Sequence, residues 1–543
     1  MKKRSFRDLG EHIDELRKRG LLREIDTPIN KDAHMHPLVR WQFRGGIEEK
    51  DRKAFLFTHV VDGRGRRFDL PVLVGGLAGN GAIYATGMDC EVAEISNRWA
   101  HALANPVAPE VVTEAPCHEV VLQGDALQGA GNGLDALPIP VSTPGFDSSP
   151  TLTATNVITK DPDSGIQNQG TYRAGLKAPT RMVVRMATRS GGAGGYQHWL
   201  KYKARGQLMP CAVVLGCPPY VAFMGPQKLP LGMDEMEVAG GLAGEAVQMV
   251  KAVSVGLMVP ADAEVVIEGL IDPSKGEPEG PFGESHGHVA LEEFNMPFEV
   301  TAITHKRKAV VPSYISQVTP SESSVIKRVA YEPLFYHHLR NHLNITSVRR
   351  VSLHEPLTSL LRVTIISIAD GAPKTEVWRA LYGAASFKGD CGKITIAVNE
   401  DIDPDNADAL LWALAYRHNP AEDLMVLPHR GQGHGPKREH DGEEDATLLI
   451  DATMKSPMPP LALPGKSYME EARAIWEELG LPSLKPESPW HGYSLGDWHA
   501  RWTEAANNAA RGDYLVNGEE TLGRQRDNVV PETSVRNLEN DWD

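Results

Sequence analysis

Two glutamates in one short segment are the first candidates for catalysis. Glu279 and Glu284 lie in residues 277–284, EPEGPFGE. The glycines and proline between them predict sharp turns, so both carboxylates can converge on one point although no helix carries them. A buried carboxylic acid can deliver a proton to a carbanion, while a neighbour beside a cation stays ionised. A solvated acidic turn is the alternative for this segment taken alone.

An arginine could act with them. Arg173 ends the segment 168–173, NQGTYR, which follows an alternating run and a turn and therefore predicts the returning strand of a hairpin. Asn168 and Arg173 would face opposite sides of a regular strand, one toward a cofactor and one toward a substrate, unless Gly170 forms a bulge. A guanidinium can bind both oxygens of a carboxylate or phosphate. Pairing with a surface acid is the alternative.

Three separated residues form a candidate metal site. Asn168, His198 and Glu235 offer an amide oxygen, an imidazole and a carboxylate. This donor set suits Mn²⁺ or Mg²⁺ bridging a phosphate better than a structural zinc. Each residue also has a structural alternative: His198 as a hydrogen-bonded residue, and Glu235 as a carboxylate favoured by a helix N-terminus. The glycines at 191–195 fit neither a P-loop nor a dinucleotide-binding motif.

Further polar residues surround these motifs. Thr153 and Thr155 share one face of a predicted strand, where they could line a pocket or face solvent. His286 and His288 either touch the acidic segment or cap a strand. The basic, glycine-rich segment 429–438 favours a lid over an acidic substrate, with a plain exposed loop as the alternative.

The elements that must position these residues fall into regions that differ in predicted secondary structure. Short β-rich runs broken by Gly and Pro predict a barrel or sandwich between about residues 111 and 318, interrupted by a helix at 234–253. Alternating helices and strands before and after it predict α/β regions. The expected parts are an N-terminal region, 1–110; a β-rich domain, 111–320; an α/β domain, 321–480; and an extension, 481–543. The expected helices elsewhere are 5–19, 91–104, 321–342, 374–385, 406–416 and 468–479.

Composition excludes several classes of protein. The 543 residues predict two or three domains, and the net charge of −15 argues against a general nucleic-acid binder. Because the sequence shows no signal-peptide pattern and no apolar run of about 18 residues, we expect a cytoplasmic protein that does not span a membrane. Its five scattered cysteines suit neither a zinc site nor a disulfide framework, and we expect them to be buried and reduced, with Cys391 nearest to solvent.

Several motifs together resemble the UbiD family of reversible non-oxidative decarboxylases. The resemblance runs from about Asp8 to about His434 and rests on segments in the family's order. They are Asn168-x4-Arg173, GGAGGYQHWLKYKARGQLMP, PLGMDEMEVAGGLAGEAVQMVKAVSVGLMVPADAEVVIEGLI, PEGPFGESHGHV and KITIAVNEDIDPDNADALLWALAYRHNP. The resemblance implies an N-terminal α/β region, a central split β-barrel like that of flavin reductases and a C-terminal α/β domain used in oligomerisation.

The resemblance also implies a cofactor and a site. The cofactor is prenylated FMN, whose phosphate is held through a manganese-like divalent ion and K⁺. The family's metal positions fall on Asn168, His198 and Glu235, and its Glu-Arg-Glu triad on Glu279, Arg173 and Glu284. Further cofactor contacts are expected from Thr153, Thr155, Gln197 and Lys393, with Lys388 as the alternative to Lys393. Arg173 would also contact the cofactor and would either grip the substrate carboxylate or orient the cofactor.

The implied activity is decarboxylation of an aromatic acid through a covalent adduct with prenylated FMN. A hydroxybenzoate, a phthalate-type acid or an aryl thioester are the candidate substrates, and CO2 is the second product. Glu284 would donate the proton, and Glu279 would keep Arg173 and Glu284 in register. A flavin prenyltransferase would supply the cofactor, and a homo-oligomer, dimer or hexamer, is expected. The alternatives are a decarboxylase of α,β-unsaturated, cinnamate-like acids and a non-catalytic flavin-binding or assembly protein.

Overall fold

The computed structural model describes residues 6–186, 193–227, 229, 233–358, 361–388, 391–431 and 444–538. The chain divides into two compact units, Met1–Thr453 and Met454–Asp543. All the candidate site residues belong to the first unit. Among the described residues, no helix is long and apolar enough to cross a membrane.

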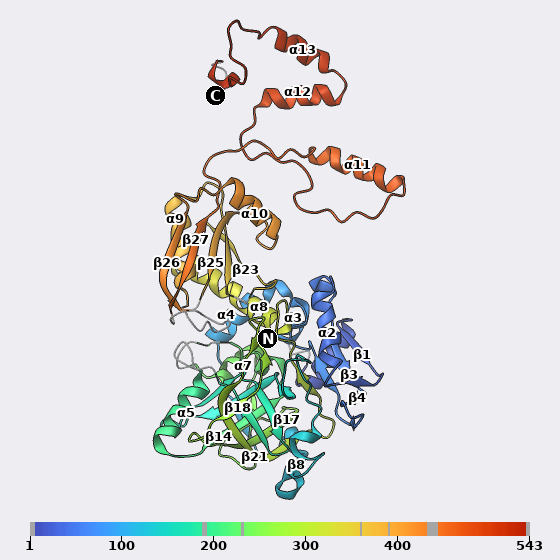
Figure 1. Ribbon diagram of the computed structural model, residues 1–543, viewed down its shortest axis with the longest axis vertical. Helices are drawn as coiled ribbons and strands as arrows, with labels where there is room; N and C mark the ends of the chain where they lie inside the picture. The colour runs from blue at the N-terminus through green and yellow to red at the C-terminus, as the bar shows by residue number, and fades with distance from the viewer. Residues whose placement is uncertain are drawn as a thin grey trace. The chain divides into compact units, whose positions relative to one another are not determined.

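The N-terminal region is a small mixed sheet covered by helices (Figure 1). Its first helix starts at Leu9 because the Asp8 carboxylate accepts the Glu11 N–H at 2.9 Å, and it buries Leu9, Ile13 and Leu16 against the sheet. The sheet consists of β1 (Leu22–Ile25), β3 (Ala54–Phe57), β6 (Val72–Val74) and β22 (Val311–Ser313). The helices are α1 (Leu9–Lys18), α2 (Met35–Arg44), α3 (Gly81–Gly87) and α4 (Ile95–Ala104), and a second small sheet holds β2 (Ile29–Asn30), β4 (Val60–Val61) and β5 (Arg67–Phe68).

A ten-stranded sheet in which all the pairings are antiparallel forms the centre of the first unit. Its main path runs β11-β10-β14-β17-β21-β13-β12-β9, and β18 and β8 also pair with β21. No pairing joins the end strands β11 and β9 among the described residues, so the split barrel stays a prediction. The strands are β8 (Val120–Gln123), β9 (Thr151–Leu152), β10 (Thr155–Lys160), β11 (Gln167–Gly170), β12 (Ala174–Ala178), β13 (Arg181–Val184), β14 (Met209–Leu215), β17 (Val265–Ile271), β18 (Glu277–Glu279) and β21 (Glu293–His305).

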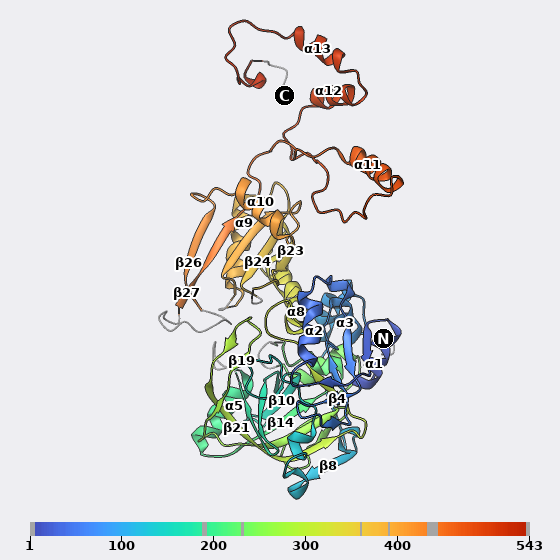
Figure 2. The same cartoon turned by 45° about the vertical axis from the view of Figure 1, so that its right-hand side comes forward.

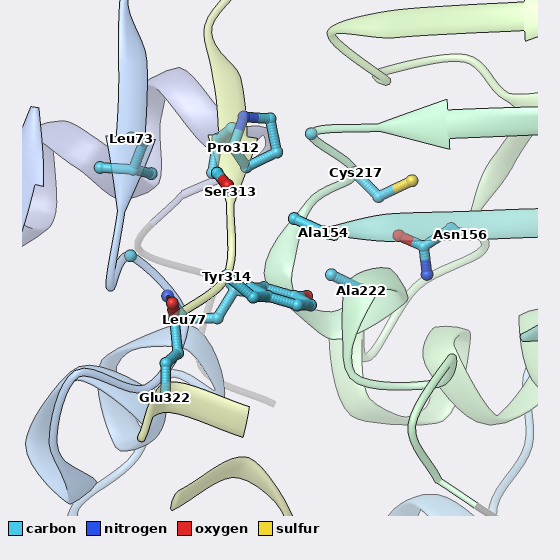
Figure 3. Close-up of a pocket in the computed structure, with 13 residues that line it drawn as sticks. Leu73, Leu77, Ala154, Asn156, Cys217, Ala222, Pro312, Ser313, Tyr314 and Glu322 are labelled. Carbon is cyan, nitrogen blue, oxygen red and sulfur yellow. Dashed lines mark hydrogen bonds between the residues drawn. The ribbon is translucent and has the colours of Figure 1, made fainter. Parts of the chain in front are cut away.

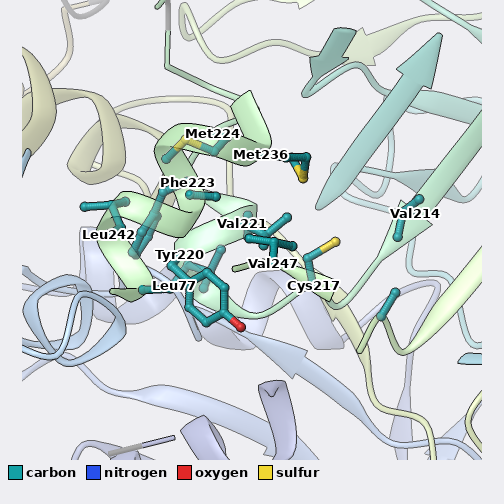
Figure 4. Close-up of a cluster of buried hydrophobic side chains, with 14 of the residues drawn as sticks. Leu77, Val214, Cys217, Tyr220, Val221, Phe223, Met224, Met236, Leu242 and Val247 are labelled. Atoms are coloured by element: carbon teal, nitrogen blue, oxygen red, sulfur yellow. The ribbon is translucent and has the colours of Figure 1, made fainter. Parts of the chain in front are cut away.

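Both faces of this sheet are buried. Along β14, Val213 and Leu215 enter one hydrophobic core while Ala212 and Val214 enter another, because successive side chains of a strand point to opposite faces. Figure 4 shows the second core, where Val214 faces apolar side chains from the segments around Tyr220 and Met236. All five cysteines are buried, including Cys391, which was expected nearest to solvent.

Helices and short strands between the sheet strands complete this region. The helices are α5 (Gly194–Arg205), α6 (Pro219–Ala222) and α7 (Glu235–Ala243), and the short strands are β7 (Glu110–Val112), β15 (Gln248–Lys251), β16 (Met258–Pro260), β19 (Phe282–Gly283) and β20 (Val289–Ala290). The prediction of a long helix at 234–253 is wrong for its second half. The helix stops before Gly244, whose φ of +76° ends it, and the chain then enters β15.

The C-terminal α/β region is built on a five-stranded mixed sheet, coloured yellow to orange in Figure 1. The order is β23-β24-β25-β27-β26, in which β24, β25 and β27 run parallel. The strands are β23 (Val348–Leu353), β24 (Val363–Ile368), β25 (Ile394–Asn399), β26 (Leu424–Gly431) and β27 (Glu444–Asp451). The helices are α8 (Glu322–His337), which continues as a π-helical turn, His338–His342, α9 (Lys374–Ser386) and α10 (Ala407–Tyr416).

Helix α8 connects this region to the rest of the first unit. It contacts α3, α4 and β23, and it lies beside α3 in both views (Figures 1 and 2). At its start the buried Glu322 accepts the backbone N–H groups of Gly75, Leu77, Ala78 and Ile315 at 3.0 to 3.3 Å. The Glu322 carboxylate therefore connects the start of α8, through hydrogen bonds, to the backbone that follows β6 and β22.

The second unit contains α11 (Lys466–Glu478), α12 (Ala500–Ala510) and α13 (Tyr514–Leu522). None of these helices has a buried residue. The expected helix at 468–479 is α11, and it groups with the C-terminal unit and not with the α/β sheet.

Candidate active site

Arg173, Glu279 and Glu284 form one buried ion cluster. Arg173 donates from Nε to Glu279 Oε1 at 2.7 Å and from Nη2 to Glu279 Oε2 at 2.9 Å, and its Nη1 donates to Glu284 Oε1. Burial alone disfavours the cation, but the bonds and charges of the two glutamates outweigh it and raise the pKa of Arg173. The sequence motifs 168–173 and 277–284 therefore meet in the folded chain.

The acidic segment has a defined path and is not a solvated turn. Glu279 ends β18, which pairs with β21, and Glu284 follows β19, which pairs with β20. Glu279 and Glu284 are 5% and 6% exposed. Asp147 holds the segment from outside, since its carboxylate accepts the Gly283 N–H at 2.8 Å and the Thr143 N–H at 2.7 Å. Burial raises the pKa of Asp147, and these two N–H bonds oppose that change.

Three residues of the cluster were not identified from the sequence. Arg185 donates from Nη1 to Glu284 Oε1 at 2.8 Å, and Asn295 donates from Nδ2 to Glu279 Oε2 at 2.9 Å. The Phe282 ring lies under the Arg173 guanidinium, 4.5 Å from Cζ to the ring centroid. Asn295 could be found only from strand register, because it pairs with Glu277 across β18 and β21. No sequence motif marks Arg185.

A cavity of about 320 Å³ lies against this cluster. Arg173, Arg185 and Glu284 line it on one side, and the residues of α8 and of the chain before it line another side. The lining residues are Thr153, Thr171, Tyr172, Arg173, Arg185, Gly225, Pro226, Phe282, Glu284, Ser285, Tyr314, Ser316, Ser323, Ile326 and Lys327. A volume of a few hundred Å³ suits a small organic ligand.

A second cavity, of about 300 Å³, contains two of the three predicted metal ligands. Asn168 and Glu235 both line it, and burial raises the pKa of Glu235 to about 7. His198 is placed near them by strand register: Thr159 is the cross-strand partner of Asn168, and its hydroxyl lies 2.9 Å from His198 Nδ1. This contact leaves Nε2 as the ring nitrogen for a metal ion.

No group of three His, Cys, Asp or Glu side chains that could hold a metal ion occurs among the described residues. Asn168 is not one of these residue types, so the expected set contributes only His198 and Glu235 to such a group. The metal site at Asn168, His198 and Glu235 therefore stays a prediction.

Several buried polar atoms without partners belong to residues that line one or the other cavity. Asn156 Nδ2, Asn168 Nδ2, Gln169 Oε1 and Thr171 Oγ1 are buried without a hydrogen-bond partner among the described residues. Gln169 lines the second cavity and Thr171 lines the first. A Cβ on Gly225 would lie only 2.3 Å from Thr171 Oγ1, so glycine keeps this place open. Asn156 lines neither cavity. Buried polar atoms without partners are costly, and polar groups of a ligand in these cavities would satisfy those of Asn168, Gln169 and Thr171.

The remaining predicted cofactor residues lie in different places. Thr153 lines the first cavity, but its hydroxyl accepts the Tyr314 N–H at 2.9 Å, and the Thr155 hydroxyl donates to the Tyr172 carbonyl at 2.6 Å. Gln197 is exposed on α5. Lys393 lines neither cavity and pairs with Asp445 at the start of β25. Its role at the cofactor, like that of Gln197, stays a prediction.

Two other candidate features also lie outside the cavities. His286 and His288 are in the turn between β19 and β20, where the His288 N–H donates to His286 Nδ1 at 3.2 Å. The expected lid begins inside a strand, since residues 429–431 belong to β26. Arg430 donates to the carbonyls of Ala385 and Lys388, so it is not a mobile cation over the site. The rest of the segment, including Lys437 and Arg438, lies outside the described residues.

Two family models match the chain. The 3-octaprenyl-4-hydroxybenzoate carboxy-lyase Rift-related domain matches residues 110–318. The C-terminal domain of the same carboxy-lyases matches residues 324–452. Together the two matches cover more than half of the 543 residues.

Solved structures agree with this assignment. The UbiD-class enzyme HmfF from Pelotomaculum thermopropionicum, in complex with FMN, has 27% identity and a TM-score of 0.72, over 85% of this chain and 96% of that chain. An evolved dimeric form of HmfF in complex with prFMN has 27% identity and a TM-score of 0.70, over 82% and 95%.

The vanillic acid decarboxylase of Sedimentibacter hydroxybenzoicus, at 23% identity, shares the fold with a TM-score of 0.70 over 87% and 99%. The mixed α/β multidomain fold, the buried Glu-Arg-Glu cluster and the two matching domains lead to one conclusion. The chain belongs to the UbiD family of carboxy-lyases.

Proposed function

We propose that this chain catalyses the reversible, non-oxidative decarboxylation of an aromatic carboxylic acid with prenylated FMN. The observation that carries the proposal is the buried Glu279–Arg173–Glu284 cluster at the wall of a cavity of about 320 Å³. HmfF, which shares 27% of its residues with this chain, has been solved with prFMN and with FMN. The split-barrel form of the central sheet and the homo-oligomeric state are parts of the same proposal.

The residues present fit a phosphorylated flavin. Asn168, His198 and Glu235 would hold a divalent ion such as Mn²⁺ against its phosphate, with K⁺ beside it. The unpaired atoms of Gln169 and Thr171 would bind the same molecule between the two cavities. Bound prenylated FMN supplies an electron sink for the charge left when CO2 departs, which amino-acid side chains cannot provide.

The chain's own residues would bind the acid and move a proton. Arg173 is held by Glu279 through two parallel bonds, so its position is set before any substrate arrives. Arg173 in turn positions Glu284. Glu284, which lines the cavity, would deliver a proton from its carboxyl group to the ring carbon that loses CO2. In the reverse direction the same carboxylate removes that proton.

The Glu284→Gln variant tests this role. Glutamine keeps the size of the side chain and cannot carry the proton, so we expect at least a thousandfold loss of CO2 release from an aromatic acid with prenylated FMN still bound. The measurements are CO2 release, exchange of the ring hydrogen for deuterium, and the flavin absorbance spectrum.

Glu299→Gln, an exposed glutamate on β21, is the matched control and should keep wild-type activity. Turnover by Glu284→Gln at the wild-type rate would refute the proton-donor assignment. If the wild-type enzyme acts on cinnamate but on no hydroxybenzoate or phthalate, the proposed substrate class changes from an aromatic acid to an α,β-unsaturated acid. Full cofactor loading without exchange on any acid would support a non-catalytic flavin-binding protein.

A further inference from the structure

Arg173 is already engaged by protein side chains. Its Nε and Nη2 edge, the edge that binds a carboxylate through two parallel bonds, is taken by Glu279. Its Nη1 donates to Glu284, and the Phe282 ring covers one face of the guanidinium. The Arg173 side chain is 11% exposed. The Nε–Nη2 edge of Arg173 is therefore closed to a substrate carboxylate unless Glu279 is displaced, and the Nη1–Nη2 end already donates to both glutamates.

Two other cations line the same cavity from different elements. Arg185 follows β13 directly, and Lys327 lies on α8, one turn after Ser323. Arg185 donates to one oxygen of Glu284 and is 26% exposed, more than twice the exposure of Arg173. The hydroxyl residues Ser316 and Ser323 line the cavity on the Lys327 side. The cavity thus has a cationic, hydrogen-bonding wall besides the triad.

The charges at the cavity favour an anion. Its lining contains the cations of Arg173, Arg185 and Lys327 and one carboxylate, that of Glu284, and Glu279 lies behind Arg173. Glu293 lies 4.0 Å from Arg185 outside the lining. Among the lining residues themselves, three cations accompany one carboxylate, in a chain whose net charge is −15. Such a lining attracts an anionic group of the substrate.

We propose that Arg185 and Lys327 receive the anionic carboxylate of the substrate, and that Arg173 serves to position Glu284. The proposal rests on the proposed function for the location of the substrate. Arg185 then contacts the substrate besides Glu284 and Glu293, which places the acid beside the proposed proton donor. The Lys327 ammonium on α8 makes specificity depend on the α/β region as well as on the central sheet.

The test measures binding to the flavin-loaded protein by isothermal titration calorimetry. The ligands are 4-hydroxybenzoate, isophthalate and 2-furoate, each compared with the corresponding neutral amide. Lys327→Met removes the charge at similar length, Lys327→Arg keeps it, and Lys251→Met removes an exposed lysine of β15 that lines neither cavity.

For at least one acid, we expect Lys327→Met to weaken binding about tenfold or more, because a charge-assisted contact is lost. The affinity for the corresponding amide should change less than twofold. Lys327→Arg should restore the affinity, and Lys251→Met should leave it unchanged. KM should rise in Lys327→Met with little change in kcat. Arg185→Lys should keep anion binding and lower kcat, because a lysine cannot hold Glu284 in the same geometry.

Two results would overturn the proposal. One is wild-type protein that binds none of the acids more tightly than its amide. The other is equal affinity for the acids in Lys327→Met and Lys251→Met. Failure of the proposed function has a different signature: wild-type protein would show the charge-dependent binding and the loss in Lys327→Met but release no CO2 from any acid.

Discussion

Glu279 and Glu284 bind the same arginine in different ways, and this difference separates their roles. Glu279 takes both parallel bonds from Arg173 and a third bond from Asn295, so its oxygens are committed to holding the guanidinium. Glu284 uses one oxygen, Oε1, for both Arg173 and Arg185, and it lines the cavity. Position and partners, and not residue type, support the proposed roles of Glu284 as proton donor and of Glu279 as the residue that positions Arg173.

Glu322 is a second carboxylate whose environment predicts a measurable effect. It is fully buried next to a cavity of about 20 Å³, room for about one water molecule, and Figure 3 shows it below Leu77 and Tyr314. Burial raises the pKa of Glu322 to about 7, and the bonds from four backbone N–H groups only partly oppose this. The folded chain therefore holds this proton more tightly than the unfolded chain.

Glu322 should accordingly lower the stability of the wild-type chain, relative to a variant that cannot ionise there, as pH rises from about 4.5 to about 7. The contribution of Glu322 is complete below its ordinary pKa of 4.5 and is lost through its folded pKa of about 7, a difference of about 3 kcal/mol at most. Glu322→Gln cannot ionise, so the difference in stability between wild type and variant should shrink over this pH range, although the amide lowers stability at acid pH. Thermal unfolding midpoints at pH 5 and pH 7.5 measure both effects. Parallel profiles for the two proteins would contradict the assignment.

At the scale of elements, the segment 277–284 is held by close packing against residues 143–148. A Cβ on Gly283 would lie 2.2 Å from Thr143 Oγ1 and 3.0 Å from Gln317 Cγ. Gly276, directly before this segment, has ordinary space for a Cβ, whose nearest neighbour would be Phe294 Cβ at 3.5 Å. The glycine beside Glu284 is therefore required by packing, while Gly276 tolerates a methyl group.

Gly283→Ala should lower kcat at least tenfold, because the backbone must shift and Glu284 moves with it. Gly276→Ala should stay within twofold of the wild type. Steady-state kinetics of both variants, with flavin absorbance as the check on cofactor loading, gives the comparison. Equal kinetics for the two alanine variants would show that the segment adapts without moving Glu284.

At the scale of the whole molecule, the C-terminal unit contributes helices but no helical core. Because α11, α12 and α13 have no buried residues, a chain ending at Thr453 should keep its fold and its cofactor. We expect the midpoint of thermal unfolding to change by no more than about 3 °C. Loss of bound flavin or a markedly lower midpoint would assign this unit a part in the first unit's stability.

The chain has a net charge of −15, so the places where its cations gather are informative. An acidic chain that binds an anion needs its cations gathered at one place, and Arg173, Arg185 and Lys327 line one cavity. The sequence also pointed to Arg430 as such a cation, but this side chain is bound to backbone carbonyls of Ala385 and Lys388. Contact with a cavity, and not position in a basic segment, decides which charges can reach a ligand.

The sequence by itself determined several of the elements. Helices 374–385 and 406–416 appear within one residue of their predicted bounds, because local periodicity and turn residues specify them. The helix at 234–253 was predicted too long because its apolar spacing continues past Gly244, where the positive φ stops it. The residues Arg173, Glu279 and Glu284 were identified from motifs whose order matches the family.

Only the tertiary structure decided which side chains share one cavity. Arg185 follows a strand that no motif marks, Lys327 lies in the middle of a helix, and Asn295 meets Glu279 through strand register. Local sequence specifies local conformation, because propensities and turns act over a few residues. Contacts between residues more than 100 positions apart depend on how whole sheets and helices pack, and at this site those contacts complete the acid–base cluster and its cationic wall.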